Sequence, residues 1–318
     1  MSSRTYVIGV DIGGTKIDTV LMDDQGTVLD DLIVPTGASD GATAVLDRIA
    51  ESANTLAGRA PGPVSAVGIG CTGLVNVRTG MVETAVHLFW QNVPLRDGVH
   101  RRLKFSAPVA VQNDLKAAAL GEKRYGAGIN ADTFVYLAVG TGLGAAAVIE
   151  DQVVVGSRGM AMELGHLSIY PQGRRCRCGK IGCVETHLSG TGLVNGATEY
   201  LPQYPDSLLN NPNAESVTTA AILQAFKQGD VLATRLIDEM RDGLARTISI
   251  CCAVYNPDLI ILGGGFGLAA WDVLTDKLHD RLIGLHLPEL FDPLPITQPV
   301  CSRQAIGAGV VGLQAIHL

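Results

Sequence analysis

The sequence lacks several features that mark large classes of protein. No apolar run reaches the ~18 residues that a membrane-spanning helix needs, and residues 1–14 hold no apolar core of a signal peptide. No lysine and arginine run is long enough to form the basic surface of a nucleic-acid-binding domain, and the net charge is −7. We therefore expect a cytoplasmic protein with neither membrane nor nucleic acid among its partners.

Cysteines are few, with seven in 318 residues. Without a secretory signal, an odd number of thiols favours the reduced state over disulfides. Four of them lie in apolar surroundings, where a thiol is usually buried and inert: Cys71, Cys251, Cys252 and Cys301. The other three fall within eight residues and require a different explanation.

These three are Cys176, Cys178 and Cys183, and His166 precedes the first of them by ten residues. Three thiolates and one imidazole are a complete ligand set for tetrahedral zinc, with no position left open for a substrate. The sequence therefore predicts a structural zinc site. Two carboxylates, Glu163 and Glu185, flank the ligands and would be held in place by the metal.

Glycine, by contrast, is abundant, with 38 residues, and 47 % of the chain is hydrophobic against 17 % charged. An apolar strand followed by a glycine turn recurs near residues 13, 140 and 263. Glycine turns at strand ends are where α/β proteins usually bind ligands. The pattern predicts an α/β fold, and the length suggests about two domains.

The first glycine turn reads DIGGTK from Asp11 to Lys16. The amides of Gly13 and Gly14 and the hydroxyl of Thr15 suit an anion, and Asp11 could hold Mg²⁺ through water. A plain hairpin turn is the alternative.

The second turn reads GTGLG at residues 140–144 and precedes another strand rather than a helix. This context argues against a dinucleotide-binding fingerprint, which opens a helix. A second phosphate loop, with Thr141 and Gly142 as donors, fits better.

Asn113 and Asp114 end a strand and begin a helix. Both residue types are favoured helix N-caps. A carboxylate at this place could equally act as general base on a substrate hydroxyl. The two interpretations are compatible.

Together these motifs resemble the ROK family of sugar kinases and related repressors, over nearly the whole chain. The most specific match is CRCGKIGCVE at 176–185, which follows the family pattern C-x-C-G-x-x-G-C-x-E. Five further segments match: DIGGTK at 11–16, NDLKAAALGE at 113–122, GTGLG at 140–144, ELGH at 163–166 and NPDLIILGGG at 256–265.

The resemblance implies an actin-like, ribonuclease H-like ATPase fold of two α/β domains with a cleft between them. Residues 1–114 with 304–318 would form a smaller N-terminal domain. Residues 115–303 would form a larger C-terminal domain that carries the zinc. A homodimer is expected from the family alone.

The implied activity is ATP-dependent, Mg²⁺-assisted phosphorylation of a hexose, with Asp114 taking the proton from the 6-hydroxyl. Five residues would bind the sugar: Asn113, Glu163, His166, Glu185 and Gly73. Nine residues would lie along ATP and its Mg²⁺: Asp11, Gly13, Gly14, Thr15, Lys16, Thr141, Gly142, Gly264 and Gly265.

The chain departs from the family pattern at four positions, which leaves the exact sugar open. Lys116 replaces an asparagine; on the first turn of a helix it is expected to face solvent, but if aimed at Asp114 it would lower the pKa of that carboxyl. Met162 stands where glycine is common. Thr72 replaces a proline, and His87 an asparagine.

Glucose is the leading substrate, because the run from Ser189 to Leu193 resembles glucokinase members. An N-acetylmannosamine or N-acetylglucosamine kinase is the close alternative. A sugar-responsive repressor would carry a helix-turn-helix domain before the first phosphate loop, and only ten residues precede Asp11. A zinc-binding interaction module would need neither phosphate loop.

Overall fold

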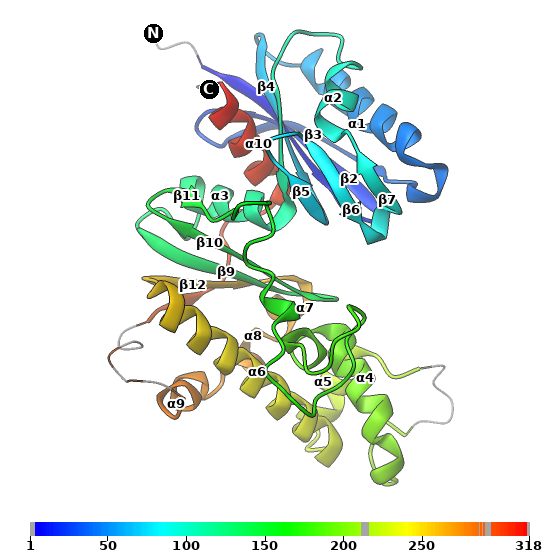
Figure 1. The fold of residues 1–318 in the computed structure, drawn as a ribbon, viewed down its shortest axis with the longest axis vertical. Coiled ribbons are helices and arrows are strands. Elements are labelled where there is room, and N and C mark those ends of the chain that lie inside the picture. The colour runs from blue at the N-terminus through cyan, green and yellow to red at the C-terminus, as the bar shows by residue number, and fades with distance from the viewer. Residues whose placement is uncertain (1–3, 211–215, 286, 288, 290–293, 317–318) are drawn as a thin grey trace. The chain divides into compact units, whose positions relative to one another are not determined.

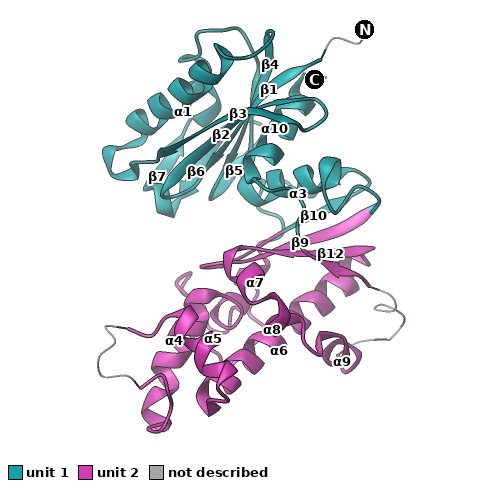
Figure 2. Ribbon diagram, turned by 180° about the vertical axis from the view of Figure 1, so that it is seen from behind, with its two compact units in different colours: residues 1–132, 146–162, 299–318 teal, residues 133–145, 163–298 magenta. Residues whose placement is uncertain are grey.

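The computed structural model describes residues 4–210, 216–285, 287, 289 and 294–316. The chain forms two compact units (Figure 2). Unit 1 comprises Met1–Asp132, Ala146–Met162 and Pro299–Leu318, and unit 2 comprises Thr133–Ala145 and Glu163–Gln298. Each unit is described by itself.

Unit 1 is built on a five-stranded sheet with the order β3-β2-β1-β4-β8. The first three strands are antiparallel, whereas β4 and β8 run parallel to β1. Their bounds are β1 Tyr6–Ile12, β2 Lys16–Asp23, β3 Val28–Pro35, β4 Val64–Cys71 and β8 Val109–Asn113. Because the carboxyl ends of parallel strands meet at one edge, β1, β4 and β8 bring the predicted site segments of unit 1 together there.

Helices cover both faces of this sheet: α1 Ala42–Ala57 and α2 Leu95–His100 on one, α3 Asp114–Tyr125 and α10 Gln304–Ala315 on the other (Figure 1). Residues Ile8 and Val10 pack with α1, and Val7 packs with α10. Glycines permit the close approach of α10. A Cβ atom on Gly68 would lie 1.9 Å from the Ala308 carbonyl oxygen, which explains the small residues of this terminal helix.

A three-stranded antiparallel sheet completes unit 1: β5 Leu74–Asn76, β6 Met81–Ala85 and β7 Trp90–Val93. The sequence interpretation did not foresee these strands. They are short, but they bury Val75, Val82 and Trp90 in the same core as α1.

A second five-stranded sheet has the order β11-β10-β9-β12-β13. Its strands are β9 Thr133–Val139, β10 Leu143–Ile149, β11 Gln152–Val153, β12 Leu259–Gly263 and β13 Ile296–Thr297. Two apolar runs on either side of Glu150 to Gln152 predict a hairpin at residues 145–155, and β10 and β11 form it. Strand β12 runs parallel to β9, so the glycine turns near residues 140 and 263 follow the carboxyl ends of neighbouring strands.

Six helices are described in unit 2: α4 Gly190–Tyr200, α5 Thr219–Lys227, α6 Val231–Tyr255, α7 Gly265–Ala269, α8 Trp271–Thr275 and α9 Leu278–Ile283. The sequence from Val231 to Tyr255 predicts a helix, and the 25-residue α6 has these bounds. Asp230 caps it by accepting a hydrogen bond from the Ala233 N–H at 2.8 Å, and Asn256 ends it in a left-handed conformation. The polar, proline-containing stretch from Asp206 to Ala214 predicts a surface loop, and part of it lies outside the described residues.

The α/β class agrees with the prediction, but the units divide the chain differently from the predicted domains. Helix α3 and residues 146–162 belong to unit 1, and unit 1 is the longer of the two. The reason is packing, because α3 lies against α10 and β4 and buries Ala117 and Leu120 there. A boundary placed after Asp114 overlooked this buried face.

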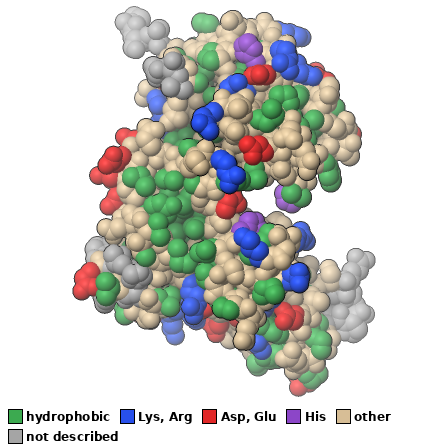
Figure 3. All heavy atoms as spheres, viewed as in Figure 1, with side chains coloured by type: hydrophobic (Ala, Val, Ile, Leu, Met, Phe, Trp, Pro, Cys, Tyr) green, Lys and Arg blue, Asp and Glu red, His purple; other side chains and the backbone are tan. Residues whose placement is uncertain are grey.

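Within the described part of the chain, no helix is both long and apolar enough to cross a membrane. Charged side chains of both signs are interspersed over the face drawn in Figure 3.

Candidate functional site

Asn113 and Asp114 lie where β8 gives way to α3. The Asn113 side chain accepts hydrogen bonds from the N–H groups of Leu115 and Lys116 at 3.2 and 3.3 Å, so the predicted N-cap is present. Its amide also donates to the Gly73 carbonyl at 3.2 Å. Asp114 accepts from the Leu115 N–H at 2.9 Å. The two residues thus fix the start of α3.

Two carboxylates gather at the same edge of the sheet, on either side of Gly70. A Cβ atom built on Gly70 would lie 3.5 Å from the Asp114 Cα and 3.7 Å from Asp11 Oδ1. Burial raises the pKa of Asp11 to about 7, and the charges of Asp114 and Asp18 add to that effect. Burial also raises the pKa of Asp114. Carboxylates with raised pKa values at a strand edge are typical of a functional site.

The first glycine turn, residues 13–15, joins β1 to β2 as a hairpin. The Gly13 N–H donates to the Lys16 carbonyl at 3.0 Å, and the Thr36 hydroxyl donates to the Gly13 carbonyl at 2.8 Å. Thr15 and Lys16 are exposed. The hairpin interpretation is therefore correct, and it leaves the exposed hydroxyl and ammonium available to an anion.

Unit 2 holds a cavity of about 950 Å³ beside the second glycine turn. Its lining includes Thr141, Arg177, Asn195, Thr218, Thr219 and Gly265. The neighbouring Gly264 has a φ of +83°, and a Cβ atom there would lie 2.5 Å from the Val139 carbonyl oxygen. Only glycine fits this position without strain.

The second glycine turn is held by the first turn of α4. The Gly190 N–H donates to the Gly140 carbonyl at 2.8 Å, and the Thr191 N–H donates to the Thr141 carbonyl at 3.2 Å. Ser189 caps α4 through the Gly192 N–H at 2.9 Å. The sequence interpretation missed Asn195, Thr218 and Thr219 as lining residues. Thr218 caps α5, so a cap signal before an apolar run was available there.

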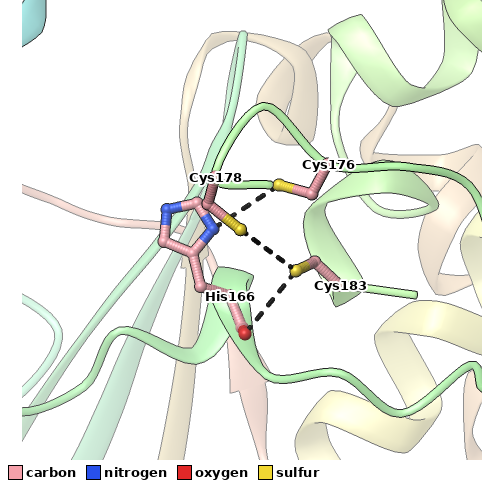
Figure 4. Close-up of side chains that lie close together, drawn as sticks. All are labelled: His166, Cys176, Cys178 and Cys183. Atoms are coloured by element: carbon pink, nitrogen blue, oxygen red, sulfur yellow. Dashed lines mark hydrogen bonds between the residues drawn. The ribbon is translucent and has the colours of Figure 1, made fainter. Parts of the chain in front are cut away.

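The three cysteines and His166 come together as predicted (Figure 4). Their ligand atoms all lie within 4.8 Å of one another. Cys176 Sγ lies 3.7 Å from His166 Nδ1, and Cys178 Sγ lies 3.5 Å from Cys183 Sγ. A tetrahedral zinc with Zn–S bonds of about 2.3 Å gives S···S edges of about 3.8 Å, so the arrangement fits such a metal. The other ring nitrogen of His166 points away from the thiols in Figure 4.

Glycines shape the loop that carries the thiols, residues 174–185, called the thiol loop below. The Cys176 N–H donates to the Lys180 carbonyl at 2.8 Å, and the Gly179 N–H donates to the Cys176 carbonyl at 2.9 Å. Gly179 and Gly182 have φ values of +91° and +77°, which disfavour a side chain. A hydrogen bond from the Lys180 N–H lowers the pKa of Cys178, which favours the thiolate that binds metal.

The carboxylates that flank the cluster have different surroundings. Glu185 Oε2 accepts a hydrogen bond from the Leu143 N–H at 3.0 Å, which ties the end of the thiol loop to the second glycine turn. Glu163 is exposed, and its carbonyl accepts from the His166 N–H at 3.1 Å. The preceding Met162 is buried in a left-handed conformation, with φ of +71°.

Arg174 anchors the thiol loop to the helices behind it. Its guanidinium donates to Glu199 at 2.9 Å on α4 and to Glu239 at 2.6 Å on α6. It also donates to the Thr186 carbonyl at 3.0 Å. Hydrogen bonds with His187 and Arg174 lower the pKa of Glu239 to about 2, against the opposing effect of its burial. The loop is thus held by its protein contacts as well as by its ligand set.

The prediction that Lys116 faces solvent is wrong. Its side chain is 2 % exposed, and its ammonium donates to the Gly159 carbonyl at 3.1 Å. The first turn of α3 is covered by the segment around Gly159, which sequence spacing alone could not reveal. His87 packs against Gly14, where an added Cβ atom would lie 3.0 Å from the His87 Cβ.

Known proteins are similar to this chain in sequence and in fold. The chain is 33 % identical to a glucokinase from Halalkalibacterium halodurans over 92 % of this chain and 89 % of that protein. It is 32 % identical to a xylose repressor from Caldicellulosiruptor bescii over 86 % of this chain and 70 % of the repressor.

Solved structures of related proteins have a similar fold. A ROK hexokinase from Thermus thermophilus matches with a TM-score of 0.83 at 28 % identity, over 98 % of this chain and 99 % of that one. A ROK family glucokinase from Streptomyces griseus, solved with glucose and AMPPNP, matches with a TM-score of 0.78 at 30 % identity, over 97 % and 99 %. The model of the ROK family matches residues 7–313, and the protein belongs to that family.

Proposed function

We propose that the protein is an ATP-dependent sugar kinase that phosphorylates a hexose at its 6-hydroxyl, with glucose the leading substrate. The observation that carries the proposal is the carboxylate pair Asp11 and Asp114 beside Gly70. One carboxylate can hold the cation that accompanies ATP, and the other can accept a proton from a hydroxyl.

Phosphoryl transfer requires positioning and charge neutralisation more than covalent catalysis. Asp114 takes the proton of the attacking hydroxyl. Asp11 would hold the Mg²⁺ that accompanies ATP, and that metal would supply positive charge to the phosphates. The exposed Thr15 and Lys16, with the amides of the turn at 13–15, provide donors for phosphate oxygens.

The cavity of unit 2 supplies the nucleotide site. Its volume of about 950 Å³ suits a nucleotide-sized ligand, and Thr141 and Arg177 offer a hydroxyl and a guanidinium to phosphates. Gly265 lines this cavity and Gly264 precedes it, so both would lie near the nucleoside. The sequence interpretation did not assign Arg177 to this site.

The metal is proposed to be zinc, bound by His166, Cys176, Cys178 and Cys183, with a structural role. Glu163, His166 and Glu185 are proposed to accept and donate hydrogen bonds to sugar hydroxyls, as Asn113 and Gly73 are in unit 1. A hexose pocket needs such fixed polar partners, because an unpaired buried polar group is costly. A homodimer remains a prediction from the family.

The repressor relative makes a non-enzymatic sugar sensor the alternative. The intact carboxylate pair favours the kinase. The test is ADP release with ATP and a panel of glucose, mannose, N-acetylmannosamine, N-acetylglucosamine and xylose. Saturable turnover on one hexose supports the proposal. Release that no sugar raises above the sugar-free rate would overturn it, and a preference for an N-acetylated sugar would replace glucose.

A further inference from the structure

Lys116 is a lysine buried on the helix that carries the proposed general base. It lies on the first turn of α3, two residues after Asp114, and is 2 % exposed. Moving an ammonium out of water costs several kcal/mol unless charges and hydrogen-bond acceptors compensate. A buried lysine at this position therefore needs partners.

One partner is the Gly159 carbonyl, which accepts from the ammonium at 3.1 Å. Gly159 lies close against β5, because a Cβ atom there would lie 2.4 Å from the Val75 carbonyl oxygen. Its φ of +77° also disfavours any residue other than glycine. The Arg78 guanidinium donates to the carbonyl of Ser157, two residues before Gly159, at 3.3 Å. Lys116 thus bonds α3 to the segment 157–159, which also contacts β5 and Arg78.

This segment has an unusual backbone. Gly156, Gly159 and Met162 adopt left-handed conformations, with φ values of +70°, +77° and +71°. The segment leads directly into Glu163, a proposed sugar partner. Because a left-handed methionine is strained, the surroundings must hold it in place. Lys116 bonds the same segment three residues earlier, at the Gly159 carbonyl.

A second partner is electrostatic. Lys116 lowers the pKa of Asp114 against the raising effect of burial. Two other ionisable groups act together with Asp114, Asp11 on β1 and Cys71 on β4. Asp18 on β2 acts in turn on Asp11. Asp18 is paired with Arg303, and burial keeps Cys71 neutral by raising its pKa.

We propose, on the basis of the function proposed above, that Lys116 is a positioning residue for phosphoryl transfer. Its buried ammonium supplies positive charge to the Asp114 site and holds the turn at Gly159 against α3. A general base must be ionised to accept a proton, so a nearby fixed cation extends the pH range over which Asp114 can act.

The test compares three variants. Lys116→Met removes the charge and keeps the side-chain volume, and Lys116→Arg keeps the charge. Lys123→Met is the matched control, because Lys123 lies nine residues after Asp114 on the same helix and is bonded elsewhere, to the Ala131 carbonyl at 2.9 Å and to Asp151 at 2.7 Å. We expect the acid limb of kcat/KM in Lys116→Met to move up by about one pH unit. Below that limb the loss is about tenfold, and it diminishes at alkaline pH. Lys116→Arg restores the parent profile, and Lys123→Met leaves it unchanged.

A second measurement does not depend on activity. In protein labelled with ¹³C at aspartate carboxyls, the Asp114 resonance, assigned with Asp114→Asn, should titrate about one pH unit higher in Lys116→Met. Thermal melting establishes which variants are folded, and Lys116→Gln replaces Lys116→Met if the latter does not fold.

An unchanged Asp114 titration, or a loss of activity by the same factor at every pH, would overturn the inference. Absence of turnover in the parent would overturn the proposed function instead, while the NMR titration would still decide the role of Lys116.

Discussion

Glu185 Oε2 accepts a hydrogen bond from the backbone N–H of Leu143 at 3.0 Å. Two residues after Cys183, the last of the clustered thiols, the chain is therefore bonded to the glycine turn beside the 950 Å³ cavity. A Cβ atom on Gly142 would lie 2.5 Å from the same oxygen, so the approach is close. The proposed sugar partner and the proposed phosphate loop are thus parts of one hydrogen-bonded structure.

Two substitutions at Glu185 separate its proposed roles. Glu185→Gln keeps an oxygen for the Leu143 N–H but loses the carboxylate, so we expect the sugar KM to rise about tenfold with little change for ATP. Glu185→Ala loses both, so the ATP KM should rise as well. Steady-state kinetics with each substrate varied in turn measures this. Equal effects of the two variants on ATP would argue against the bond to Leu143 as the cause.

Asp114→Asn should lower kcat by roughly 10² to 10⁴ fold, the usual contribution of a general base. Asparagine retains an oxygen that can accept from the Leu115 N–H, so the start of α3 should stay formed. Thermal melting and ATP titration by calorimetry should match the parent. Substantial residual turnover would show that another group takes the proton.

Magnesium binding should depend on pH through Asp11. This carboxyl, with a pKa of about 7, carries a proton below that pH and is ionised above it. The affinity for Mg²⁺-ATP should therefore fall by up to about tenfold per pH unit below 7 and level off above it. Calorimetry between about pH 6 and 8, on either side of that pKa, measures the trend.

Asp11→Asn is the control, because ATP itself also binds protons in this range. The variant should bind Mg²⁺-ATP weakly at every pH, with only the dependence that ATP contributes. A parent and variant with the same pH dependence would exclude Asp11 as the titrating group.

Gly264 and Gly265 offer a matched pair beside the cavity. Gly264→Ala forces a Cβ atom to 2.5 Å from the Val139 carbonyl oxygen at a positive φ, whereas a Cβ atom on Gly265 would meet nothing within 4 Å. We expect Gly264→Ala to destabilise the fold by about 1–3 kcal/mol and to weaken ATP binding. Gly265→Ala should keep the parent melting temperature. Equal melting temperatures for the two variants would contradict the steric argument.

These residues also show what the sequence could predict. The thiol ligands were identifiable because they lie within eight residues, and helix α6 because its apolar period spans about seven turns. Thr141 and Gly265 were predicted at this site, but the rest of the cavity lining could not be foreseen, since Arg177, Asn195 and Thr218 join them only through the fold. The prediction that Lys116 faces solvent was wrong for the same reason. Helix position alone does not reveal that a distant turn at Gly159 covers the side chain.

Removal of the metal should affect ATP as well as sugar. Arg177 stands between the ligands Cys176 and Cys178 and lines the cavity beside Thr141, so a relaxed thiol loop displaces its guanidinium. We expect chelation to raise the sugar KM and to weaken ATP binding several-fold, in step with the zinc released to a colorimetric indicator. Arg177→Ala should reproduce the loss for ATP while retaining the metal, because it removes no ligand. If chelation left ATP affinity at the parent value, Arg177 would not contact the nucleotide, and the metal would act on the sugar partners His166 and Glu185 alone.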